Sequence, residues 1–215
     1  MTKVPEILEK TRQAEAVALL KRYFATKDGQ ATHTGSHFDI VGHPWNDPAH
    51  ADEITSSDLL ALSTLSVAVK GRSAIAATSP DFQTRTSELL KQIPLNASLG
   101  DPEAFDEYLA ENGPGRELWR CVDDVWGFAG TYTSKLLARK RANLFPVYDK
   151  KIKAAWALTG PGEIWRPMHQ ALSADGGALM KYAEELRVEA EVSEAVSPLR
   201  VLDSIVWRWQ KDQDR

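Results

Sequence analysis

Helix-start signals recur along this chain and constrain its fold more than any other feature. Thr55-Ser56-Ser57-Asp58 resembles a capping box, in which the first and fourth side chains cap the first turn of a helix. Ser79-Pro80, Asp101-Pro102 and Ser197-Pro198 each place a proline directly after a residue that can cap a helix. Apolar residues at helical spacing follow these starts, and hardly any segment alternates as a strand does. The sequence therefore predicts an all-α fold of about eight to ten helices.

The same patterns predict where the helices lie. A helix is expected from about Pro5 to Ala25, and Gly71 is expected to stop the helix that the capping box starts. Further helices are expected over residues 80–92, 103–109, 116–125, 149–159, 164–172, 179–188 and 198–210, and one more between the glycine turn at 127–130 and the loop that ends in Pro146-Val147. No repeat or Gly/Ser linker marks a boundary, so residues 1–215 are expected to form one helical domain. A two-lobed arrangement with a helix-hairpin-helix near 116–141 is the alternative.

Composition narrows the class of protein. Of the 215 residues, 43% are hydrophobic, which is enough for a buried core and argues against a disordered chain. Cys121, the single cysteine, falls in an apolar pattern with Leu118 and Val122, so a packed thiol is expected rather than a nucleophile. No apolar run is long enough for a membrane span, and the amino terminus lacks a secretory pattern. These features predict a cytoplasmic protein with no membrane partner.

Residues 30–52 lack a helical period and contain four of the five histidines, His33, His37, His43 and His50. A loop of this length is often functional or mobile. Imidazole is a common metal ligand, but Thr34-Gly35-Ser36 argues against the helix that would bring His33 and His37 together, and no cysteine accompanies them. We therefore expect polar loop histidines, with no metal and no cofactor.

A cationic segment contrasts with the acidic remainder of the chain. Seven basic residues and one acid lie between positions 135 and 153, whereas the formal net charge of the whole chain is -4. The basic residues are Lys135, Arg139, Lys140, Arg141, Lys150, Lys151 and Lys153. Such a segment favours a phosphate-bearing partner, and the alternative is a solvated helix face. Replacing Lys140 and Lys151 with glutamate is predicted to weaken nucleic-acid binding without unfolding the protein.

The segment from Val125 to Lys153 resembles the helix-hairpin-helix and following aspartate of the DNA glycosylase superfamily that includes endonuclease III. Phe128 to Ser134 would be the hairpin, and Pro146-Val147-Tyr148-Asp149 would place the catalytic aspartate at a helix start. The resemblance covers about 30 residues. It implies DNA as the partner, Asp149 as the catalytic carboxylate, and Gly127, Gly130 and Thr131 with the basic side chains from Lys135 to Lys151 as DNA contacts.

Two departures from the superfamily pattern matter for the expected chemistry. The superfamily hairpin usually reads Gly-x-Gly, whereas Gly127 and Gly130 are three positions apart and Phe128 stands where the first glycine is expected. Where lyase members have a nucleophilic lysine this chain has Tyr132, and Lys135 lies nearly one helical turn further on. The resemblance therefore implies monofunctional, water-mediated base excision with Asp149, and Tyr132 as a weaker catalytic candidate.

Asp149 can also be interpreted without the resemblance. A carboxylate at a helix start accepts backbone N–H bonds and lies at the positive end of the helix dipole, which favours its charged form. A charged carboxylate would stabilise a positively charged sugar in the transition state. Asp149 could equally do no more than cap the helix, and both interpretations predict the same local geometry.

The wider pattern resembles an uncharacterised bacterial protein family of unknown function. The resemblance rests on Ile54 to Leu60, on Lys135 to Arg141 with Pro146 to Asp149, and on Leu199 to Asp203 with Val206-Trp207. It implies no activity. Three hypotheses remain: a DNA glycosylase-like enzyme, a non-catalytic module that binds nucleic acid or protein, and a regulatory protein that uses loop 30–52 for a ligand.

Overall fold

The fold is all-α, as the sequence predicts. The computed structural model describes residues 4–214. Ten α-helices lie in this range: α1 (Gln13–Phe24), α2 (Ser56–Thr64), α3 (Gly71–Ala77), α4 (Pro80–Leu90), α5 (Pro114–Asp123), α6 (Gly130–Lys140), α7 (Lys150–Ala155), α8 (Trp165–Ser173), α9 (Ala178–Glu189) and α10 (Pro198–Gln213). Within the described residues, strands are confined to a small antiparallel hairpin of β1 (Thr26–Lys27) and β2 (Gln30–Ala31).

Short turns of other helix types complete the chain. Five are 3-10 helices and one is a π-helical turn: η1 (Glu6–Leu8), η2 (Lys10–Arg12), η3 (Thr34–His37), the π-helical η4 (Phe105–Leu109), η5 (Pro161–Glu163) and η6 (Ala174–Gly176). The expected helix over 5–25 is therefore wrong in its first half. Glu9 is extended, with φ -71° and ψ 141°, and separates η1 from η2.

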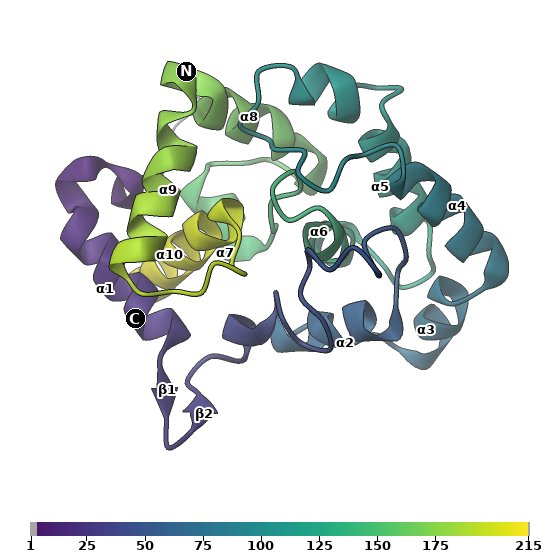
Figure 1. Cartoon of the computed structure of the whole chain (residues 1–215), viewed down its shortest axis with the longest axis horizontal. Coiled ribbons are helices and arrows are strands. Elements are labelled where there is room, and N and C mark those ends of the chain that lie inside the picture. Colours follow the sequence, from purple (N-terminus) through teal and green to yellow (C-terminus); the bar gives the residue numbers. More distant parts are fainter. Residues whose placement is uncertain (1–3, 215) are drawn as a thin grey trace.

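The helices pack around two centres (Figure 1). Helix α10 contacts α1, α7 and α9, whereas α6 contacts α2 and α5, and α4 packs on α5. One apolar cluster runs through both groups. Helix α6 lies in the middle of the view, and each of its residues from Thr133 to Lys140 is buried. The charged side chains of α6 must therefore find partners inside the protein.

Three of the four cap and proline signals locate the starts of α-helices, whereas Asp101-Pro102 precedes only the π-helical turn η4, which begins at Phe105. Thr55 and Asp58 form the reciprocal capping box of α2, Ser197 caps α10 through the N–H of Arg200, and Pro80 occupies the first turn of α4. Cys121 is buried in α5, as predicted, and burial raises the pKa of its thiol.

Helix ends are less well predicted because they lack glycine. Helix α2 stops at Thr64, and Gly71, expected to end it, instead starts α3. Ser66 adopts φ 59°, and the N–H of Val67 donates to the Leu62 carbonyl at 3.1 Å. Ala157 ends α7 in the same way, before the expected residue 159. Both are left-handed helix-ending turns, a conformation that glycine adopts most easily.

In the described part of the chain, no helix combines the length and apolar character needed to cross a bilayer.

Candidate functional site

A cavity of about 590 Å³ opens beside the first turn of α7. Thr131 and Lys135 of α6 line it together with Asp149, Lys150 and Lys151 at the start of α7. Segments remote in sequence complete the lining, which includes Tyr23, residues 32–35 and 64–67, Arg200, Asp203, Trp207 and Lys211. Both helix groups thus contribute to the cavity. Five residues that the sequence analysis names as candidate catalytic or DNA-binding residues line it.

The two carboxylate oxygens of Asp149 have different environments. Oδ1 accepts the backbone N–H of Lys151 at 2.8 Å and that of Ile152 at 3.0 Å, which caps α7. No residue of the described chain donates a hydrogen bond to Oδ2, and the half-buried side chain lines the cavity. The cap and a role in the cavity are therefore compatible, because they use different oxygens.

Lys135 brings a buried ammonium group to the same cavity. Its Nζ donates to the Leu65 carbonyl at 3.0 Å, which leaves two of its three N–H groups free of protein partners in the described chain. Burial lowers the pKa of Lys135, and the charge of Asp149 partly opposes that shift. Although the two charges interact, no direct ion pair joins them among the described residues. A ligand group or a water molecule can therefore lie between them.

An aromatic group forms another part of the lining. The His33 ring stacks on Tyr23 with centroids 5.2 Å apart, and the edge of Trp207 meets both rings. Arg208 donates to Nε2 of His33 at 3.1 Å, while Nδ1 lies 3.2 Å from the Thr32 hydroxyl. Nε2 must then accept, which places the proton on Nδ1 of a neutral ring. Burial, followed by the charges of Arg208 and nearby cations, lowers the pKa of His33, which agrees with a neutral ring.

Arg200 links the cavity to a buried carboxylate. Its guanidinium donates to the Tyr23 hydroxyl at 2.6 Å and to the Gly35 carbonyl at 2.9 Å, and it pairs with Asp203. Its Nε lies 3.6 Å from Oδ2 of Asp39, and neither atom has a hydrogen-bond partner in the part of the chain that the structure describes. Burial raises the pKa of Asp39 to about 6, against the opposing charges of Arg200 and Arg139.

This shift predicts a pH dependence of stability. Because the pKa of Asp39 is higher in the folded protein than the ordinary 3.8, its contribution is fully present below about pH 4 and is lost as the pH rises through about 6. The wild-type free energy of unfolding should fall relative to that of Asp39→Asn by up to about 3 kcal/mol over this range. Urea unfolding of both proteins between pH 4 and 7.5 measures the difference. A pH-independent difference would contradict the assignment.

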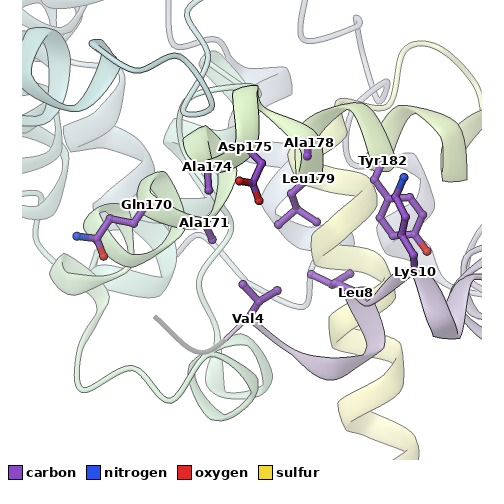
Figure 2. A pocket seen from close by; sticks show the side chains of 10 residues that line it. All are labelled: Val4, Leu8, Lys10, Gln170, Ala171, Ala174, Asp175, Ala178, Leu179 and Tyr182. Atoms are coloured by element: carbon purple, nitrogen blue, oxygen red, sulfur yellow. The ribbon is translucent and has the colours of Figure 1, made fainter. Parts of the chain in front are cut away.

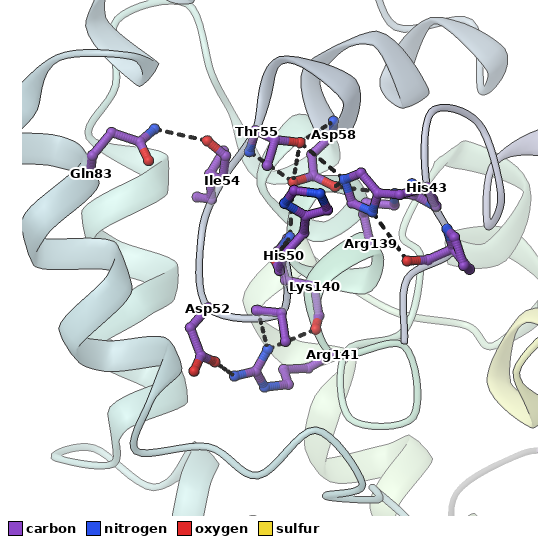
Figure 3. A network of polar contacts seen from close by, with 12 residues as sticks. His43, His50, Asp52, Ile54, Thr55, Asp58, Gln83, Arg139, Lys140 and Arg141 are labelled. Atoms are coloured by element: carbon purple, nitrogen blue, oxygen red, sulfur yellow. Dashed lines mark hydrogen bonds and ion pairs between the residues drawn. The ribbon is translucent and has the colours of Figure 1, made fainter. Parts of the chain in front are cut away.

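The cationic run of α6 lies inside the protein, contrary to the expectation of phosphate contacts or a solvated face. Arg139, Lys140 and Arg141 are each at most 1% exposed. Figure 3 shows Arg139 and Lys140 converging on Asp58, which is fully buried. Arg139 Nε lies 3.2 Å from Oδ1 and Lys140 Nζ lies 2.9 Å from Oδ2. Burial lowers the pKa of both cations, and Asp58 partly opposes the shift.

The remaining donors of this run hold loop 30–52 in place. Arg139 donates to the carbonyls of residues 38, 41 and 43, and Lys140 donates to that of residue 50 at 2.8 Å. Arg141 donates to the carbonyls of residues 51, 90 and 93 and to Asp52 at 2.6 Å. Arg139, Lys140 and Arg141 are therefore engaged inside the protein and are not exposed to DNA. Lys140→Glu would place a carboxylate beside the buried Asp58, so we expect this change to destabilise the fold. The expectation that the variant stays folded is corrected accordingly, and the effect on nucleic-acid binding stays a prediction.

Of the hairpin candidates, Thr131 lines the cavity, whereas Gly127, Gly130 and Tyr132 do not. Gly127 has φ 82° and its neighbour Trp126 is 53% exposed, with the Arg72 guanidinium 4.8 Å from its ring centre. Gly130 packs closely against the ring of Pro161. Tyr132 donates its hydroxyl to the Ala68 carbonyl at 2.8 Å and stacks on Phe128, so it does not join Asp149 in the cavity lining.

The histidines of loop 30–52 are used in polar and ring contacts. His43 lies 3.1 Å from the Thr55 hydroxyl and 3.6 Å from Asp58, and its ring centre is 4.6 Å from that of His50. Within the described residues, no three histidine, cysteine or acidic side chains form a group that could hold a metal ion.

A comparison with known protein families now places the chain. A model described as "Family of unknown function (DUF6308)" matches residues 16–210. The chain belongs to this family. No curated protein and no solved structure matches the chain. For DUF6308, the geometry beside Asp149 is therefore the basis on which a function can be proposed.

Proposed function

We propose that this DUF6308 protein binds a nucleotide unit of DNA in the cavity beside Asp149 and hydrolyses its N-glycosidic bond. The observation that carries the proposal is the free Oδ2 of Asp149 in a cavity of about 590 Å³ that also holds the Lys135 ammonium. Cavities of roughly 300–1,000 Å³ are typical of small-molecule sites, so a single extruded nucleotide is a suitable occupant.

Charge and shape support a nucleotide as the ligand. Lys150 is exposed at the rim, and Lys211 lies 4.6 Å from the ring centre of Trp207. Exposed ammonium groups attract a phosphate, and an aromatic surface favours a flat base. Lys151 already pairs with Asp214, so it contributes less free charge.

The proposed reaction breaks the bond between the sugar C1′ and the base nitrogen, whose electron pair leaves with the base. A water oxygen adds to C1′ and loses one proton, and the departing base gains one. Asp149 would stabilise the positive charge that develops on the sugar and accept the proton of the attacking water. The products are a free base and an abasic site.

Duplexes that carry a panel of damaged or modified bases test this proposal. Wild-type protein should produce abasic sites in at least one duplex, and Asp149→Asn should lower the single-turnover rate roughly 100- to 1,000-fold. Asp149→Ser is informative because serine also caps a helix, so its loss of product with normal stability separates chemistry from capping. Asp124→Asn, an exposed acid outside the cavity, is the matched control and should keep wild-type activity.

Binding without product across the whole panel would reject the enzyme and favour a non-catalytic nucleic-acid-binding module. Absence of salt-dependent DNA binding would reject both.

A further inference from the structure

A second cavity, of about 530 Å³, lies between the N-terminal turns and helices α8 and α9 (Figure 2). Its lining is mostly apolar and comes from Val4, Leu8, Ala171, Ala174, Ala178 and Leu179. None of these residues lines the cavity beside Asp149. An apolar cavity with a few polar groups is the usual form of a site for a small molecule.

Lys10 and Tyr182 lie at one end of this cavity, and neither polar group has a hydrogen-bond partner among the described residues. The hydroxyl of Tyr182 is buried and forms no hydrogen bond with another described residue, and the side chain contributes to the lining. Burial, together with the charges of Glu189 and Glu185, raises the pKa of Tyr182, so the hydroxyl keeps its proton. The Nζ atom of Lys10 lies 5.7 Å from the centre of the Tyr182 ring, and Lys10 forms no hydrogen bond or ion pair with another described residue. The ammonium group of Lys10 is exposed and is suited to an anionic oxygen of a ligand.

The remaining charges restrict what can bind. Asp175 lines the cavity from the turn between α8 and α9, and Figure 2 shows its carboxylate directed toward the apolar part of the lining. Glu185 and Glu189 lie further along α9, and Glu189 accepts a hydrogen bond from Gln13. A second negative charge on the ligand would meet repulsion from Asp175, whereas an uncharged chain would contact Leu8 and Leu179.

We propose that this cavity of about 530 Å³ binds an aliphatic monocarboxylate small enough to fit inside it, such as decanoate. The carboxylate lies against Lys10 and the chain occupies the space between Leu8, Ala171 and Leu179. This site is separate from the proposed glycosidic chemistry and does not depend on it.

Isothermal titration with decanoate, below the concentration at which it forms micelles, tests the site. Decanoate should bind saturably with one molecule per chain. Lys10→Met keeps the length of the side chain and removes its charge, and it should weaken binding at least about 10-fold, as expected for a lost charged hydrogen bond. Lys10→Arg should retain most of the affinity. Lys21→Met, at an exposed lysine of α1 outside the cavity, should bind as the wild type does.

Two further probes define the ligand class. Decan-1-ol and decanedioate should each bind at least about 10-fold more weakly than decanoate, because one lacks the anionic group and the other adds a second. Ala178→Phe, at an exposed position of the lining, should block decanoate without affecting the fold. The proposal is overturned if wild-type protein shows no saturable binding, if Lys10→Met binds decanoate normally, or if decanol binds equally well.

Discussion

Replacing Asp58 with asparagine is expected to lower the free energy of unfolding by about 3–5 kcal/mol, the cost of leaving buried charges unpaired. Asp58 is fully buried and is the acidic partner of both Arg139 and Lys140 (Figure 3). Asparagine keeps the shape and one acceptor oxygen, so it can still accept the Thr55 N–H in the capping box. The variant therefore removes the negative charge of Asp58 and keeps the capping hydrogen bond. Urea unfolding at pH 7 measures the loss.

Asp52→Asn is the matched control for this prediction. Asp52 also pairs with a buried cation of the run, Arg141, but its own side chain is 40% exposed. Arg141 keeps its bonds to carbonyl oxygens when the charge of Asp52 is removed. The expected loss is about 1 kcal/mol or less, as for partly exposed ion pairs. Equal losses in the two variants would show that the buried pairs around Asp58 do not hold the fold.

Local signals in the sequence predict the helix starts but not the burial of α6. The capping box at Thr55 and the proline after Ser79 act within one turn of the chain, so the sequence displays them directly. A run of arginine and lysine is usually exposed, and its partner Asp58 lies 81 residues from Arg139. The apolar residues on both sides of the run, Leu136-Leu137 and Leu144-Phe145, are the signal that could have indicated a buried helix.

Part of the candidate site could be predicted because its residues lie close together in the sequence. Thr131, Lys135 and Asp149 belong to one continuous segment, and the cavity brings them together. His33 and Trp207 join that cavity from distant parts of the chain. The histidine-rich loop 30–52 is a candidate ligand site in the sequence, but no local pattern links His33 or Trp207 with Asp149. Tertiary packing, rather than local sequence, places these rings beside Asp149.

The second prediction with a large expected effect is that binding affinity depends on the charge of the ligand beside Asp149. If Oδ2 faces a sugar that becomes positively charged, a stable cationic mimic of that sugar should bind tightly, because transition-state analogues bind better than neutral ligands. Two unit charges about 4 Å apart interact by roughly 4 kcal/mol at the effective dielectric constant typical of a protein surface. A preference of about 100-fold or more for the cationic mimic is therefore expected.

The most direct measurement compares two DNA duplexes that differ at one position, a pyrrolidine abasic-site analogue with a cationic ring nitrogen and a neutral tetrahydrofuran analogue. Fluorescence anisotropy at fixed salt gives both dissociation constants for wild type, Asp149→Asn and Lys150→Gln. Lys150→Gln should weaken both duplexes alike, since a rim lysine would contact phosphate. Wild type should prefer the pyrrolidine duplex about 100-fold, and Asp149→Asn should bind the two equally. Equal binding by the wild type, or an unchanged preference in Asp149→Asn, would contradict a catalytic carboxylate at Asp149.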